Sequence, residues 1–167
     1  MFEFRLIRED ELEKIMQLQK DCFAVLENHD WLRRNDEDTF RLCLKQPNYS
    51  LGFFDGDKLA AIGILQICGL SEENLGRQLG FEGEKLNEVG NMKLVLVDPD
   101  YQGRRLQHQL MDRCEEYARQ QKLRVLATTV HPDNVYSIRN VEKCGYAFHS
   151  QHEKYGGLIR NLYYKNL

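Results

Sequence analysis

The residues that most constrain the fold are 94–130, where a strand, a turn, a helix and a second strand follow one another. An apolar run ends at Asp98-Pro99, an amphipathic helix covers residues 104–122, and a further apolar run covers residues 123–130. A strand–helix–strand unit of this kind predicts two parallel strands joined by a right-handed crossover. The rest of the fold has to accommodate that parallel pair.

The turn inside this unit has the composition of a phosphate-binding loop. Gly103 allows the backbone to come close to a ligand, and Arg104 and Arg105 add positive charge. The free N–H groups of the following helical turn, together with the helix dipole, favour an anion there. An ordinary connection with solvated arginines is the alternative, because most helix N-termini bind no phosphate.

The rest of the chain alternates short apolar runs with amphipathic segments. Further strands are predicted at residues 2–7, 49–54, 59–68, 91–97, 146–152 and 158–165, and further helices at 9–19 (with 22–26 as an extension), 35–44 and 135–144. An Asp-Gly hairpin turn joins the second and third strands. Residues 71–88 form a long connection with short helical pieces, and a connection of this length is often functional.

Length and composition indicate one soluble globular domain over residues 1–167. The net charge of −3 and the scattered basic residues argue against nucleic-acid binding, and no apolar run is long enough to span a membrane. The five cysteines form no Cys-x-x-Cys pair and the five histidines form no ligand pattern, so we expect reduced thiols and no metal. A cytoplasmic location is the expectation that follows.

Three motifs in this order of elements resemble the GCN5-related N-acetyltransferase (GNAT) superfamily. Residues 97–107 (VDPDYQGRRLQ) are similar to the acetyl-CoA pyrophosphate loop of that family. Residues 134–146 (NVYSIRNVEKCGY) resemble its Asn-x-x-(Ala/Ser)…Glu-Lys-x-Gly-(Phe/Tyr) helix, and residues 155–165 resemble its last strand. The resemblance implies an α/β (α+β) GNAT fold. Its central sheet would be mixed, largely antiparallel and six- to seven-stranded, with a splayed parallel pair at its centre and about four flanking helices.

The resemblance also implies acetyl-CoA as cosubstrate and no metal. The fourth strand would offer main-chain groups to the pantetheine arm, and the loop would hold the pyrophosphate. The residues implied in cofactor binding are Leu96, Val97, Gln102, Gly103, Arg104, Arg105, Leu106, Gln107, Asn134 and Ser137.

Four positions depart from the family pattern. Arg105 and Gln107 stand where two small residues are usual in the loop. Val141 stands where many members carry a tyrosine that acts as general acid, and Asn91 stands where some hold a catalytic glutamate. Arg105 could itself pair with a phosphate group, because a guanidinium binds phosphate well.

Acetyl transfer to an amine needs a group that takes the amine proton, since a lysine-like amine has a pKa of about 10.4. Glu88 and Glu84, just before the fourth strand, are the acids expected to reach the cleft, with Glu88 the choice for the base. Asp98 and His131, at two strand ends, are rivals. A solvated carboxylate or a turn histidine is the alternative for each.

The departing thiolate needs a hydrogen-bond donor, and Ser137, one turn into its helix, is the choice. Its alternative is a hydroxyl bonded to its own helix. Tyr136, Tyr163 and Tyr164 are rivals for this role. For Cys144 a buried core thiol is preferred over a nucleophile.

The sequence therefore predicts an N-acetyltransferase that acts by direct transfer on a primary amine of a small molecule or peptide. Acidic residues in the segments that would build the acceptor pocket favour a cationic amine. A GNAT-fold module that binds acyl-CoA without catalysis is the alternative function. A homodimer is an oligomeric state that the sequence leaves open.

Overall fold

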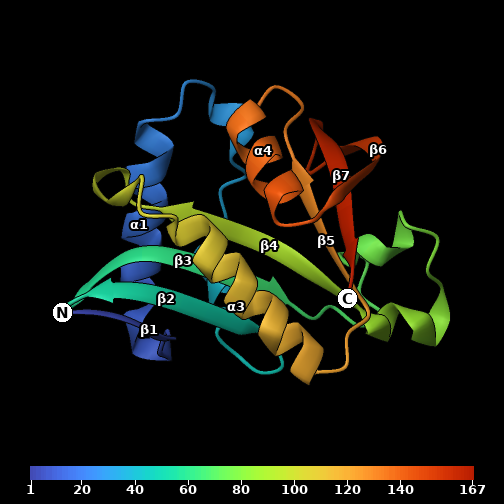
Figure 1. Cartoon of the computed structure of the whole chain (residues 1–167), viewed down its shortest axis with the longest axis horizontal. Coiled ribbons are helices and arrows are strands. Elements are labelled where there is room, and N and C mark those ends of the chain that lie inside the picture. The colour runs from blue at the N-terminus through green and yellow to red at the C-terminus, as the bar shows by residue number, and fades with distance from the viewer.

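The computed structural model describes residues 1–167, and its strands join in one seven-stranded sheet (Figure 1). The strands are β1 (Phe2–Leu6), β2 (Tyr49–Asp55), β3 (Lys58–Gln66), β4 (Val89–Val97), β5 (Val125–Val130), β6 (Ala147–Lys154) and β7 (Leu158–Asn166). The α-helices are α1 (Leu12–Ala24), α2 (Glu37–Cys43), α3 (Leu106–Gln120) and α4 (Val135–Lys143). Five short 3-10 helices complete the chain: η1 (Glu9–Glu11), η2 (His29–Trp31), η3 (Leu75–Arg77), η4 (Gly83–Glu88) and η5 (Pro99–Tyr101).

The strand order is β1-β2-β3-β4-β5-β7-β6, and every neighbouring pair is antiparallel except β4 and β5. This confirms the predicted mixed sheet with a parallel pair at its centre and four flanking α-helices. The predicted order of elements is confirmed as well, including the two-residue hairpin turn between β2 and β3 and the helical pieces of the long connection.

The parallel pair is short. Only residues 89–91 of β4 pair with residues 125–127 of β5, after which the two strands diverge. Gly90 lies at this pairing point, where a Cβ atom would come within 2.8 Å of Leu123 Cδ1 and 3.0 Å of Leu65 Cδ1. A larger residue here would have to displace the leucine side chains that pack over Gly90. Beyond residue 91 the β4 edge that faces β5 has no backbone partner.

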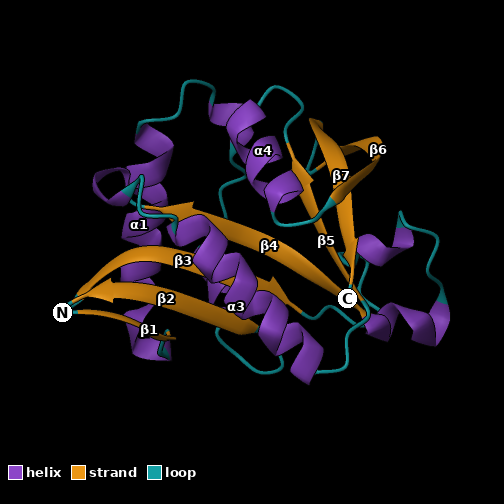
Figure 2. Ribbon diagram, in the orientation of Figure 1, coloured by secondary structure: helices purple, strands orange, loops and turns teal.

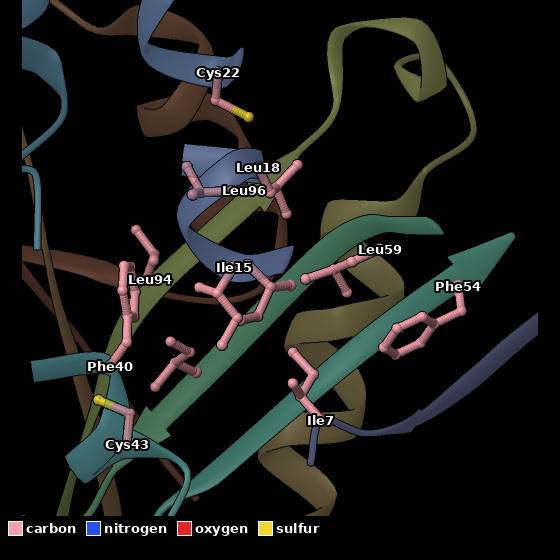
Figure 3. Packing of buried hydrophobic residues seen from close by; sticks show 12 residues of the cluster. Ile7, Ile15, Leu18, Cys22, Phe40, Cys43, Phe54, Leu59, Leu94 and Leu96 are labelled. Atoms are coloured by element: carbon pink, nitrogen blue, oxygen red, sulfur yellow. The ribbon is translucent and has the colours of Figure 1, made fainter. Parts of the chain in front are cut away.

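Helices cover both faces of the sheet (Figure 2). On one face α1 and α2 pack on β3 and β4 through a cluster that includes Ile15, Leu18, Phe40, Ile62 and Leu96 (Figure 3). On the other face α3 lies across β2, β3 and β4, with Leu106, Leu110 and Cys114 on its buried side as the sequence predicts. Burial of side chains of this size stabilises the fold by roughly 1.5–3 kcal/mol each.

None of the helices combines the length and the hydrophobicity that crossing a membrane requires. The five cysteines are all free thiols.

Candidate active site

A cavity opens where β4 and β5 diverge, and residues from both faces of the sheet line it. Its volume is about 140 Å³, and it is partly open to solvent. We call one side the α4 half; its residues are Gln107, Met111, Asn134, Ser137 and Val141. We call the other side the η2 half; its residues are Trp31, Arg33, Gln66, Glu73, Asn91, Tyr155 and Arg160.

The loop between β4 and α3 presents an uninterrupted row of free backbone N–H groups. No N–H from Gln102 to His108 donates to a backbone carbonyl, and Gln109 N is the first to do so, to Arg105 O at 3.1 Å. Residues 102–105 are exposed, and the first turn of α3 contains no acidic side chain. Free amides at the positive end of a 15-residue helix form a site for an anionic group such as a phosphate.

The backbone of this loop turns through two residues with positive φ. Gly103 has φ +82° and nothing within 4 Å of its Cβ position. Arg105 has φ +58° and is the N-cap of α3, in the left-handed conformation that disfavours residues with a side chain. This conformation explains why a small residue is usual at this position in the family. Arg105 adopts it at some cost in backbone strain.

The two large residues of the loop direct their side chains differently. The Gln107 carboxamide lies toward α4, where its Oε1 accepts a hydrogen bond from Asn140 Nδ2 at 2.8 Å. Arg105 is exposed and makes no side-chain hydrogen bond or salt bridge, so its guanidinium is free to meet an anion on the loop. Neither side chain accepts a hydrogen bond from the free N–H groups of the loop.

The remaining loop and strand residues contribute through the backbone. The Arg104 guanidinium lies 5.4 Å from the Phe2 ring and 5.1 Å from the Tyr101 ring. Leu106 is buried against β2 and β3, and Leu96 lies in the α1 core. The β4 residues that line the cavity are 91–95, and Leu96 and Val97, predicted to bind the cofactor, are not among them.

Helix α4 brings three residues to the cavity at helical spacing: Asn134, Ser137 and Val141. Asn134 Oδ1 accepts a hydrogen bond from Ser137 N at 3.2 Å and so caps the helix. The Ser137 hydroxyl makes no hydrogen bond, which differs from the alternative of a hydroxyl bonded to its own helix. A free donor in the cavity is what the predicted role of Ser137 requires. Val141 adds an apolar surface where a tyrosine is common.

Glu88, predicted to be the base, does not line this cavity. Its carboxylate lies 3.8 Å from Arg124 Nε, at the far end of β4 where the parallel pair begins. Glu84 is exposed and also lies outside the cavity. The position just before β4 is thus too early in the strand, since the opening occurs only after residue 91.

The two rival bases have structural roles. Asp98 is buried; its Oδ1 accepts from Asp100 N at 2.8 Å, and its Oδ2 lies 3.1 Å from Lys58 Nζ. His131 Nδ1 accepts from Asp133 N at 3.1 Å within a turn. Neither residue lines the cavity.

Glu73 is the only acidic residue that lines the cavity, and the sequence analysis missed it. It lies in the long connection after β3, which Asn74 anchors through hydrogen bonds to Gly69 O and Leu86 O at 2.8 and 2.9 Å. Asn91 Nδ2 donates to Glu73 O at 2.8 Å and holds this segment against β4. The length of this connection was the sequence feature that suggested a functional role. Its packing against β4 depends on the buried side-chain amides of Asn74 and Asn91.

The rival tyrosines and Cys144 lie outside the cavity. Tyr136 is exposed, and Tyr163 is buried in the core beneath α4. Cys144 Sγ lies 3.6 Å from His108 Nδ1, a neighbour that sequence reasoning did not place there. Burial raises the pKa of the Cys144 thiol, which favours the neutral form over a nucleophilic thiolate.

Two buried polar atoms of the η2 half have no hydrogen-bond partner within the protein, Trp31 Nε1 and Gln66 Oε1. Buried polar atoms are nearly always satisfied, so this donor and this acceptor are available to a polar ligand or an ordered water in the cavity. The structure contains no group of three or more side chains that suits a metal ion.

A family model described as the acetyltransferase (GNAT) family matches residues 12–146. The chain belongs to this family. Its GNAT resemblance, stated above on three motifs, is thereby confirmed. Comparison with curated proteins gives no match.

Solved GNAT structures share the fold across their whole length. NAA60 from Arabidopsis thaliana, in complex with acetyl-CoA, has a TM-score of 0.77 at 16% identity, with 100% of this chain and 99% of that chain covered. The ribosomal-protein-S18-alanine N-acetyltransferase from Escherichia coli has a TM-score of 0.74 at 16% identity, with 99% and 94% covered. For yncA from Salmonella typhimurium with its cofactor acetyl-CoA, the TM-score is 0.73 at 15% identity, again with 99% and 94% covered.

Proposed function

We propose that this GNAT protein transfers an acetyl group from acetyl-CoA to a primary amine of a small molecule or peptide, by direct transfer. The observation that carries the proposal is the cavity between β4 and β5, which joins the α3 side of the sheet to the polar η2 half. A donor held on one face and an acceptor on the other would meet in this gap. Much of the rate of such a reaction comes from positioning.

The residues present fit acetyl-CoA, which when bound supplies an activated thioester. The free N–H groups from Gln102 to His108, with Arg105, would hold its pyrophosphate. The unpaired edge of β4 and the Asn134 side chain would orient its pantetheine arm. Two of the solved structures with this fold contain acetyl-CoA, which supports the same assignment.

Two side chains of the cavity have the chemistry that proton movement requires. Glu73 is the carboxylate available to accept a proton from the acceptor amine. The Ser137 hydroxyl is free to donate a hydrogen bond to the sulfur atom that leaves. Glu73 replaces Glu88 in this proposal, and Ser137 is retained from the sequence analysis.

A module that binds acyl-CoA without catalysis is the second candidate. Val141 favours it, because a valine in the cavity offers no proton where many family members carry a tyrosine.

Calorimetric titration with acetyl-CoA, followed by an assay of CoA release with a panel of amines, separates the two candidates. We expect saturable binding and amine-dependent release of CoA. Tight binding without turnover on any amine would support the module instead, and absence of binding would contradict both candidates.

A further inference from the structure

The η2 half of the cavity carries an excess of positive charge. Among the charged residues that line the cavity, Arg33, Lys93 and Arg160 are cationic and Glu73 alone is anionic. A pocket built only for a cationic amine would have the opposite balance, because like charges repel. The composition of the pocket therefore requires an anionic group as well.

Arg160 is the most informative of these residues. It is 3% exposed, and its Nη2 and Nη1 donate to Asp30 O at 2.7 Å and Ile159 O at 3.0 Å. No carboxylate lies within 4.0 Å of its guanidinium, and burial lowers its pKa. A buried guanidinium with free N–H groups and no counter-ion is costly unless a ligand supplies the missing anion.

A second guanidinium lies beside the first, against the same aromatic ring. The Arg33 Cζ atom is 4.1 Å from the centre of the Tyr155 ring, and Arg160 Cζ and Lys154 Nζ are each 5.9 Å from it. The pKa of Lys154 is lowered by burial and also by Arg33. The only salt bridge of Arg33 is a loose one, 3.9 Å from Nη1 to Glu73 Oε2. The cations Arg33, Lys154 and Arg160 thus gather around one ring, and the only carboxylate within 4.0 Å of any of them is Glu73.

The two buried polar atoms without a hydrogen-bond partner are one donor and one acceptor. The Trp31 Nε1–H group is a donor without an acceptor, and Trp31 follows Asp30, the residue whose carbonyl accepts from Arg160. Gln66 Oε1 is an acceptor without a donor, and its strand neighbour Asn91 bonds to Glu73 O. The cavity lining thus offers one free donor and one free acceptor in addition to its charged groups.

We infer that the acceptor is a primary amine that also carries a carboxylate, an amino acid or close relative. Arg33, Arg160 and the Trp31 N–H would bind the carboxylate, while Glu73 and Gln66 Oε1 would face the amine. Guanidinium groups suit this task because their planar forks match carboxylate oxygens. The inference rests on the proposed function and narrows its acceptor class.

The phosphates of acetyl-CoA do not account for this cluster. The free amides from Gln102 to His108 already provide for them at the N-terminus of α3. Arg33, in the segment after η2, and Arg160, in β7, reach the cavity from the half that α3 and α4 do not form.

The test compares matched acceptors. Acetylation is measured for α-, β- and γ-amino acids, each paired with its own carboxamide, and for an aminoalkylphosphonate. We expect at least one amino acid to exceed its carboxamide about tenfold to hundredfold in kcat/KM, as loss of a charge-assisted hydrogen bond implies. Equal rates for acid and carboxamide in every pair would overturn the inference, and so would a preference for the phosphonate.

Variants identify the residues responsible. Arg33→Gln should raise KM for the amino acid and reduce its advantage over the carboxamide several-fold, with kcat less affected. Arg160→Lys should likewise raise KM and reduce the advantage over the carboxamide. If Arg160→Lys, at a buried position, prevents folding, Arg33→Gln alone provides the test. Arg124→Gln is the matched control, because Arg124 is 77% exposed and lies outside this cavity. An unchanged preference in Arg33→Gln and Arg160→Lys would contradict the assignment.

A binding measurement separates this inference from the proposed function. The same amino acids and carboxamides are titrated calorimetrically into the protein without acetyl-CoA. Binding of an amino acid but not of its carboxamide supports the carboxylate site even if no turnover occurs. Turnover of neutral amines, with no preference for a carboxylate in either assay, leaves the acetyltransferase proposal intact and overturns the inference.

Discussion

Arg105 occupies a left-handed backbone position at the start of α3 where a glycine would be free of strain. Its exposed guanidinium has no partner in the protein, whereas the neighbouring Arg104 guanidinium lies against the rings of Phe2 and Tyr101. Arg105 is thus the arginine of this loop whose charge is available to a ligand bound at the free amides.

Arg105→Gln should weaken acetyl-CoA binding about tenfold, because one charge-assisted contact to phosphate is lost. Arg104→Gln should weaken it less, since that guanidinium already contacts aromatic rings. Calorimetric Kd values for the two variants check this. Equal losses, or a larger loss in Arg104→Gln, would contradict the distinction between the two arginines.

Ser137 is the residue of α4 proposed to donate a hydrogen bond to the leaving sulfur atom. Ser137→Ala should lower kcat about tenfold to hundredfold and leave the acetyl-CoA Kd nearly unchanged, because a hydrogen bond formed as the thiolate develops is absent from the ground state. Ser150→Ala is the control, since Ser150 lies in β6 and outside the cavity. An unchanged kcat in Ser137→Ala would return Ser137 to a structural role.

At the scale of elements, the loop between β4 and α3 depends on the backbone shape of Gly103. Proline has no N–H and a φ near −65°, whereas Gly103 has φ +82°. Gly103→Pro should therefore weaken acetyl-CoA binding at least tenfold. Gly83→Pro is a matched change, because Gly83 is also exposed with positive φ and nothing within 4 Å of its Cβ position. It should leave the Kd unchanged, and an equal effect of both changes would place the phosphate site elsewhere.

The connection from β1 to α1 depends on a buried carboxylate. Two hydrogen bonds from Arg5, at 2.7 and 2.9 Å, hold Glu11, which also accepts from Arg8 N at 2.9 Å. These bonds, that of Arg5 first, lower the pKa of Glu11 to about 2. The unfolded chain, with an ordinary glutamate pKa near 4.3, takes up the proton first as pH falls.

The free energy of unfolding should therefore fall between about pH 4.5 and pH 2, and Glu11→Gln should flatten this dependence. The variant should also lose roughly 2–3 kcal/mol at pH 7, as the pKa shift implies. Denaturant unfolding at several pH values measures both effects. Glu13→Gln, at an exposed position without a salt bridge, should keep the wild-type profile. A wild-type slope in Glu11→Gln would contradict this account.

The sequence predicts the elements well, because local patterns control them. The 3.6-residue periodicity of α3 and the Asp-Gly turn after β2 are local signals, and both elements form as predicted. The place of Glu73 in the cavity was not predicted, for a non-local reason. Glu73 reaches the cavity only because Asn74 and Asn91 fasten the long connection to β4, and no periodicity reports such contacts. Glu88 directly precedes β4 in the sequence, but its carboxylate lies near Arg124, outside the cavity.

At the scale of the whole molecule, the divergence of β4 and β5 organises the site. Three residues of β4, Gly90 among them, pair with β5 at one end, and beyond them a cavity extends to both faces of the sheet. The α3 side offers free amides to an anion, and the η2 half offers one carboxylate among several cations. The proposed direct transfer would use this arrangement, with each substrate approaching from its own side.

The most direct test is an NMR titration of the ¹⁵N-labelled protein with CoA. The backbone amide signals of residues 102–108 should move downfield and saturate, because these N–H groups gain phosphate acceptors that the protein does not supply. Signals of residues 122–125, in the separate hollow beside Glu88, should remain in place. Saturable shifts at residues 122–125, with the signals of residues 102–108 unmoved, would contradict the account.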